Sequence, residues 1–338
     1  MIIGYDGPCY HISEVCLKEW AYWGYQPSLA TNIAFAALFG ISTIAYLVQG
    51  IMGKRWLGFT VAMGTGCAIE VVGYIGRILA HADQFAEVRL WILFVDPRID
   101  TPQNPFLIQI ICLTIAPAFL AAGIYLCLSR IVTTVGPQHS RIKPLSYPKI
   151  FIPCDFISLV LQAAGGGMAS VATHNGEDPE KGNHIMIAGL AFQVATMLLF
   201  ILLALDFAWR TYQGRTSLGQ ISPDQQPAII RRSWPFKAFL VALSLSTLCI
   251  FTRCVFRVAE LSEGWEGHIA NTQKYFIGLE GGVIIAAVLL LNLCHPTHCF
   301  KDADDVRGVQ LQRLPDGSTT EFPGLNALSG MQQAQKWM

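Results

Sequence analysis

The sequence has little charge for its length. Only 14% of its 338 residues are Asp, Glu, Lys or Arg, whereas 53% are hydrophobic. Soluble domains usually carry about 25% charged residues, so this composition argues for a membrane protein. The formal net charge is zero, and the basic excess of a nucleic-acid-binding protein is therefore absent.

The motifs of several enzyme and receptor classes are also missing. No Gly-rich loop leads into Lys-Ser or Lys-Thr, so ATP is not predicted to be the direct energy source. The last apolar run has no central lysine that could bind retinal, and the eight histidines lie at the ends of apolar runs or outside them. A metal centre needs several convergent ligands. We therefore expect no metal, no cofactor and no enzymatic activity, and an intramembrane lipid-modifying enzyme is the least favoured alternative.

What the sequence does contain is seven apolar runs, each close to the roughly 20 residues that cross the hydrocarbon core of a bilayer. They lie at about 29–50, 56–79, 106–130, 150–172, 184–208, 236–258 and 275–294. Lipid cannot satisfy exposed backbone groups, so each run is predicted to be a helix. The predicted fold is all-α, a seven-transmembrane-helix bundle within a membrane domain at 25–298.

The distribution of charge along the chain predicts its orientation. Lys and Arg concentrate in the first, third and fifth connections and after the last run, whereas acidic residues gather at 173–183 and 259–274. Basic loops stay in the cytoplasm. The N-terminal segment 1–24 is therefore predicted to be extracellular, and the C-terminus cytoplasmic.

The two ends of the chain carry separate expectations. Residues 299–338 are polar and rich in Gly, Pro, Ser and Gln, which is typical of a disordered tail. Cys9 and Cys16 both fall in the predicted extracellular segment. A disulfide between them is chemically permitted in that compartment, and two free thiols are the alternative.

Polar and ionisable residues interrupt the apolar runs. The candidates for substrate binding or translocation are Glu70, Tyr74, Arg77, Asp155, Gln162, Gln193, Arg253, Arg257, Glu260 and Glu280. The first three are spaced by three and four residues, so they share one helix face. A charge at the bilayer centre costs roughly 2.5–3.5 kcal/mol on insertion scales. We therefore expect these side chains to face the bundle interior and to pair.

Two interpretations of this polar set stay open. Three acidic and three basic members are predicted to lie near the outer leaflet, where they can balance one another. They could form a polar cavity that holds the head group of an amphiphile or carries protons. Alternatively, they could form an ion-pair network that only fixes how the second, sixth and seventh helices assemble. The glycines at 165–167 are predicted to serve close helix packing.

Long stretches of the sequence resemble the fungal RTA-like family, lipid-translocating exporters associated with aminocholesterol resistance and with release of sphingoid long-chain bases. The matching stretches are YQPSLATN at 25–32, GCAIEVVGYIGR at 66–77, APAFLAAGIYLCLSRI at 116–131, IFIPCDFISLVLQAAGGGMAS at 150–170, AGLAFQVATMLLF at 188–200, RCVFRVAELSEGWEGHI at 253–269 and HP at 295–296. Together they touch every predicted helix and include the membrane charges.

The resemblance assigns residues to family motifs. Those in the second, fourth and sixth helices are Glu70, Tyr74, Arg77, Asp155, Gln162, the triplet 165–167, Arg253, Phe256, Arg257 and Glu260. The chain departs from the family in two places. It reads NTQKY where the family commonly has an acidic residue before the last helix, and Glu280 stands where the family commonly has Asp.

The resemblance implies an integral membrane protein of the plasma membrane, or of an endomembrane, that exports a sphingoid base or sterol-like amphiphile and confers tolerance to toxic amphiphiles. Its expected partners are membrane lipids or amphiphilic small molecules. No nucleic acid is expected, and protein partners stay open. The alternative is a seven-helix lipid sensor that regulates the response to membrane stress without moving lipid.

Overall fold

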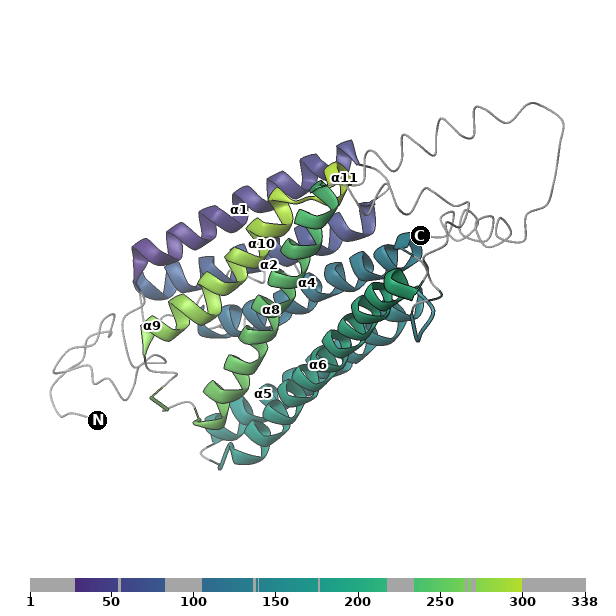
Figure 1. Ribbon diagram of the computed structural model, residues 1–338. Coiled ribbons are helices and arrows are strands. Elements are labelled where there is room, and N and C mark those ends of the chain that lie inside the picture. Colours follow the sequence, from purple (N-terminus) through teal and green to yellow (C-terminus); the bar gives the residue numbers. More distant parts are fainter. Residues whose placement is uncertain are drawn as a thin grey trace, which may run out of the picture. The chain divides into compact units, whose positions relative to one another are not determined.

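The computed structural model describes helices along most of the chain (Figure 1). The described residues are 28–53, 56–82, 105–135, 138, 140–175, 177–217, 234–264, 267–268 and 272–299. Their helices are α1 (Leu29–Met52), α2 (Leu57–Ala82), α4 (Pro105–Val135), α5 (Ser146–Asn175), α6 (Glu180–Ser217), α8 (Trp234–Ser262), α9 (Gln273–Tyr275), η4 (Phe276–Gly282), α10 (Val283–Leu293) and α11 (Pro296–Cys299). Seven helical segments are long and apolar enough to cross a membrane, the last being the continuous run of α9, η4 and α10. The predicted all-α fold with seven membrane-spanning helices is confirmed.

Some predictions fall outside the described part of the chain. Cys9 and Cys16 and nearly all of the predicted tail lie there. The chain separates into two compact units, residues 1–299 and 300–338, and the described helices all belong to the first. Which end of the helices faces the cytoplasm stays a prediction from the basic residues.

The helices extend beyond the apolar runs that predicted them. The largest extension is in α6, which has 38 residues and is therefore about 57 Å long at 1.5 Å per residue. The hydrocarbon core is only about 30 Å thick. Hydropathy marks the part of a helix that lies in lipid, whereas the helix itself continues into polar residues such as Asp206 and Arg210.

Each spanning helix packs against the next one along the chain, and the last packs against the first. The Nε atom of Arg77, late in α2, donates to Oδ1 of Asn32, early in α1, at 3.3 Å, as expected for antiparallel neighbours. Tyr46 of α1 donates to the Val288 carbonyl of α10 at 3.0 Å and so closes the ring. The third helix, α4, also contacts α6 and α8 and is the most buried of the seven.

Large apolar side chains cover the outward faces of the bundle. On α1, Ile41, Ile44 and Ile51 are 65%, 63% and 76% exposed, and Phe156 of α5 is 65% exposed. Contiguous exposed apolar surface of this kind is unfavourable in water. It fits a bundle whose outer surface contacts lipid, as expected for an integral membrane protein.

Close contact between α5 and α6 depends on two glycines. A Cβ atom added to Gly165 of α5 would lie 2.4 Å from the backbone nitrogen of Met186, and one added to Gly182 of α6 would lie 2.4 Å from the nitrogen of Ala169. The two helices run side by side in Figure 1. Backbones can approach this closely only where both side chains are absent. The predicted packing role of the glycine triplet therefore applies to Gly165, whereas Gly167 would meet nothing within 4 Å.

We expect Gly165→Ala to lower the free energy of unfolding by about 1–3 kcal/mol, because the new methyl group forces α5 and α6 apart. Gly167→Ala is the matched control, two residues along the same helix. It is expected to leave stability unchanged or to raise it by up to about 1 kcal/mol through helix propensity. Thermal unfolding of the two variants in one detergent measures the difference, and equal midpoints would contradict the packing role.

Candidate functional site

The polar face of α2 is buried inside the bundle. Glu70, Tyr74 and Arg77 are 2%, 0% and 1% exposed, as their spacing along one helix face predicts. Tyr74 packs between two aromatic rings of α1, with ring centroids 5.2 Å from Phe35 and 5.7 Å from Phe39. These contacts hold the second helix so that its charged side chains face away from lipid.

A buried ion pair joins α8 to η4. One guanidinium nitrogen of Arg253, Nη2, lies 2.6 Å from Oε1 of Glu280, and both side chains are less than 5% exposed. The same nitrogen donates to the backbone carbonyl of Leu113 in α4. That carbonyl lacks its usual helical donor, because Pro117, four residues later, has no N–H group. Arg253 therefore satisfies a carboxylate on one helix and a free carbonyl on another.

Glu280 lies near charged residues of both α2 and α8. It interacts electrostatically with Glu70 and Tyr74 of α2 and with Arg257 and Glu260 of α8. Arg257 and Glu260 form an ion pair of their own, one helical turn apart. The acids and arginines predicted on the second, sixth and seventh helices are thus brought together. We call Glu70, Tyr74, Arg77, Arg253, Arg257, Glu260 and Glu280 the arginine–glutamate cluster.

The backbone around Glu280 is a π-helix. The segment η4 has seven residues, Phe276–Gly282, between the α-helical turns of α9 and α10. A π-turn holds one extra residue and so widens the helix locally, and such turns occur frequently at functional sites. The apolar pattern predicted a helix at 275–294, which the structure confirms. The structure adds that Glu280 lies within a π-helical turn of this helix.

Arg77 contacts neutral groups. Its Nε donates to Asn32, and its guanidinium carbon lies 3.8 Å from the centre of the Phe276 ring in η4. A cation above an aromatic face is attracted by the ring electrons. Arg77 therefore ties α2 to both α1 and η4. No ion pair joins Glu70 to another described residue, so the predicted arginine pairing holds for Glu280 and Glu260.

Several buried polar atoms of the cluster have no hydrogen-bond partner among the described residues. They are Oε1 of Glu70, Oη of Tyr74, Oε2 of Glu280, Nε of Arg253 and Nε of Arg257. Buried polar groups in folded proteins are nearly always hydrogen-bonded. A concentration of unpaired acceptors and donors at one point is therefore typical of a site that binds a polar group.

The remaining predicted residues form a second cluster between α4, α5 and α6. Asp155 accepts hydrogen bonds from Tyr125 at 2.9 Å and from Thr196 at 3.4 Å. Gln162 donates to Gln193 at 3.1 Å. None of these five side chains bonds to the arginine–glutamate cluster. We call them the aspartate–amide cluster; Asp155 has no basic partner there.

Two side chains of the aspartate–amide cluster, Tyr125 and Thr196, and the Asn32 partner of Arg77 were not among the predicted site residues. Asn32 and Thr196 are polar residues within apolar runs, and Tyr125 lies inside the third run. The spacing of Gln193 and Thr196, three residues apart, placed both on one helix face and could have indicated the contact with α5. Within the described ranges, no group of three His, Cys, Asp or Glu side chains could hold a metal ion.

Gly281 fixes the distance between η4 and α2. A Cβ atom at this position would lie 2.6 Å from Oη of Tyr74 and 2.7 Å from the ring of Phe35, whereas one at Gly278 would meet nothing within 4 Å. We expect Gly281→Ala to destabilise the protein by about 1–3 kcal/mol and Gly278→Ala to have little effect. Thermal unfolding of the purified variants tests this difference. A stable Gly281→Ala protein would contradict the close contact of Tyr74 with η4.

Comparison with known proteins assigns the chain to a family. The family model described as RTA1 like protein matches residues 63–303. The sphingoid long-chain base transporter RSB1 of Saccharomyces cerevisiae is 34% identical over 302 residues, covering 83% of this chain and 74% of that protein. Protein RTA1 and protein RTM1, both from Saccharomyces cerevisiae, are each 26% identical, covering 90% and 81% of this chain and 94% and 91% of their own lengths. No solved structure matches the chain. The chain belongs to the RTA1-like protein family, whose model covers all or most of six of the seven spanning helices.

Proposed function

We propose that the protein moves an amphiphilic lipid, a sphingoid long-chain base or a sterol-like compound, across the bilayer and so confers tolerance to toxic amphiphiles at the plasma membrane. Support comes from the relative named as a sphingoid long-chain base transporter. The observation that carries the proposal is the arginine–glutamate cluster, in which buried acceptors without partners are gathered inside a membrane bundle.

The chemistry of the cluster suits an ammonium head group. An ammonium has three N–H donors and no acceptor. The acceptors without partners are Oε1 of Glu70, Oε2 of Glu280 and Oη of Tyr74. Two of them belong to carboxylates, and hydrogen bonds between ionised groups are roughly twice as strong as neutral ones. A sphingoid base would complete these contacts with its amine.

The arginines set the charge of the site before the lipid arrives. Arg253 and Arg257 each pair with a glutamate, and their side chains are themselves buried. Glu70 forms no ion pair with another described residue, so its carboxyl group is open to a cationic head group. A carboxylate buried without a partner is costly, and a bound ammonium would compensate it. Glu70 is therefore the proposed anchor of the amine.

Asp155 supplies a second buried carboxyl group. Its hydrogen-bond donors are the neutral hydroxyl groups of Tyr125 and Thr196, and no described basic side chain faces it. Intramembrane carboxyl groups of this kind commonly mark proton relays. We assign Asp155 to proton uptake that accompanies transport, rather than to contact with the amine.

The proposed selectivity is tested with proteoliposomes that contain purified wild-type protein. A fluorescent sphingoid base is expected to cross the membrane faster than in protein-free vesicles. An N-acylated analogue with the same chain, which lacks the ammonium group, is expected to cross at the protein-free rate because no cation is available for Glu70. Stopped-flow quenching of the outer-leaflet probe measures both rates. Equal acceleration of the two lipids would contradict recognition of the amine.

The lipid-sensor alternative gives a different result in the same experiment. The protein would bind the sphingoid base, as measured by tryptophan fluorescence or calorimetry, yet would leave transbilayer movement at the protein-free rate. Binding without movement would therefore replace the transporter by a sensor, while the arginine–glutamate cluster would remain the binding site.

A further inference from the structure

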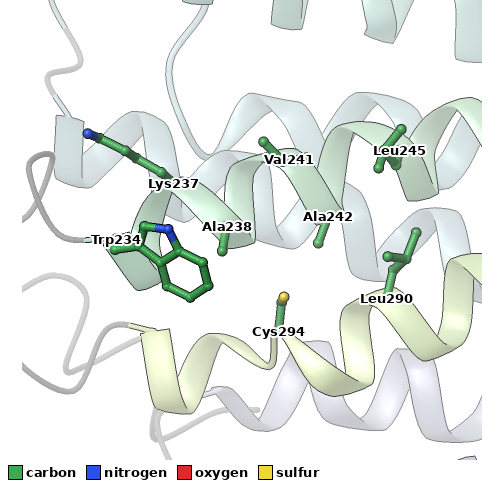
Figure 2. Close-up of a pocket in the computed structure, with 8 residues that line it drawn as sticks. All are labelled: Trp234, Lys237, Ala238, Val241, Ala242, Leu245, Leu290 and Cys294. Carbon is green, nitrogen blue, oxygen red and sulfur yellow. The ribbon is translucent and has the colours of Figure 1, made fainter.

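An apolar groove opens between the first half of α8 and the end of α10, away from the arginine–glutamate cluster. Its volume is about 350 Å³, at the lower end of the range of small-molecule pockets, about 300–1,000 Å³. Ala238 and Ala242 of α8 face Leu290 of α10 and Cys294, the residue that follows α10, across it (Figure 2). The small alanine side chains leave this space, whereas farther along α8 the helices are joined by the hydrogen bond from Ser246 to the Ala287 carbonyl.

One end of the groove is positively charged. Lys237 and Trp234 lie at that end in Figure 2. Both are exposed, and no hydrogen bond or ion pair joins the Lys237 side chain to another described residue. The helix α8 begins at Trp234, so the positive end of its dipole lies beside the lysine. The rest of the lining is apolar, with small and aliphatic side chains.

This pattern is the complement of an amphiphile with a negative head group. An apolar chain in the groove would pack against the small and aliphatic side chains of α8 and α10, and a phosphate would meet Lys237 and the first turn of α8. Trp234 adds an aromatic ring of the kind enriched at head-group depth. The predicted orientation places this end of the bundle in the cytoplasmic leaflet, where anionic lipids attract basic residues.

We propose that the groove binds one acyl chain of an anionic glycerophospholipid, whose phosphate contacts Lys237. The site is distinct from the proposed translocation site. Lys237 and Arg253 are sixteen residues apart on α8, about 24 Å along the helix axis. The bound phospholipid is a structural lipid of the bundle, and the proposal holds whether or not the protein moves sphingoid bases.

The test uses full-length protein in nanodiscs of phosphatidylcholine that contain a small fraction of a photoactivatable lipid. The probe is phosphatidylserine or phosphatidylcholine with the same diazirine-bearing chain, and mass spectrometry locates the labelled residues. In the wild type we expect phosphatidylserine to label the groove residues of α8 and α10 about fivefold more than phosphatidylcholine does, the effect of one basic residue near anionic lipid. Lys237→Gln is expected to remove that preference.

Two further variants separate charge from shape. Lys149→Gln removes an exposed lysine from the start of α5 and is expected to leave the preference unchanged. Ala238→Trp fills the groove, and labelling by both lipids is expected to fall there, whereas Leu248→Trp on the same helix outside the groove keeps it. Equal labelling by the two lipids in the wild type, or a preference that survives Lys237→Gln, would overturn the proposal.

Discussion

Arg253→Met is expected to lower the free energy of unfolding by about 3–5 kcal/mol, the usual effect of breaking a buried ion pair by removing one partner. Glu280 would be left buried beside an apolar side chain, although it now lies 2.6 Å from a guanidinium nitrogen. The Leu113 carbonyl would lose its donor at the same time. Chemical unfolding in detergent micelles, with membrane abundance as a second readout, measures the loss.

A double variant distinguishes loss of the pair from loss of the fold. In Arg253→Met/Glu280→Met no charge is left without its partner, so most of the lost stability is expected to return. Recovery should be incomplete, because the carbonyl freed by Pro117 still lacks a donor. A double variant as unstable as the single one would contradict the account of Arg253 and Glu280 as a compensated pair.

Glu70→Gln is expected to slow the movement of a sphingoid base in proteoliposomes by about tenfold to a hundredfold. Hydrogen bonds to charged groups contribute about 1.5–3 kcal/mol, and glutamine keeps the shape of the side chain while it removes the charge that faces the amine. Stability should change little, because no ion pair joins Glu70 to another described residue. The stopped-flow assay measures the rate.

The matched control is Glu180→Gln, the same change at an exposed position at the start of α6. It is expected to leave both transport and stability at wild-type values. Equal transport by Glu70→Gln and wild type, at equal folding and abundance, would remove Glu70 from the mechanism. The arginine–glutamate cluster would then be a network that fixes helix assembly, the alternative that the sequence left open.

The seven-helix fold was predictable because lipid imposes one local requirement on every spanning segment. About 20 apolar residues must satisfy their own backbone groups, and this requirement is visible in the sequence without knowledge of any neighbour. The buried face of α2 was predictable for a similar reason, because residue spacing within one helix also needs no knowledge of a neighbour. Glu70, Tyr74 and Arg77 were expected to share a buried face from spacing alone, and all three are buried.

The pairing between helices could not be derived in the same way. Glu280 meets Arg253 from within a π-helical segment at the start of the last spanning helix, and apolar periodicity does not distinguish a π-turn from an α-turn. Asp155 was grouped with the other acids by its residue type. The structure separates it from them, because its helix face contacts Tyr125 and Thr196 on α4 and α6.

The sequence does contain a signal for one contact between helices, the hydrogen bond from Arg253 to the Leu113 carbonyl. Pro117 within the third apolar run predicts a carbonyl without a helical donor at Leu113, and a buried arginine on another helix is a natural donor for it. The structure shows Arg253 in that position. Prolines inside spanning helices therefore point to where a polar side chain from a neighbour is needed.

The most direct test of the central claim is a cryo-electron microscopy structure of the protein in nanodiscs with a bound sphingoid base. The account predicts density for the amine between Glu70, Tyr74 and Glu280, within hydrogen-bond distance, about 3 Å, of their oxygen atoms. Head-group density at another place on the bundle, with the cluster unchanged beside it, would contradict the account.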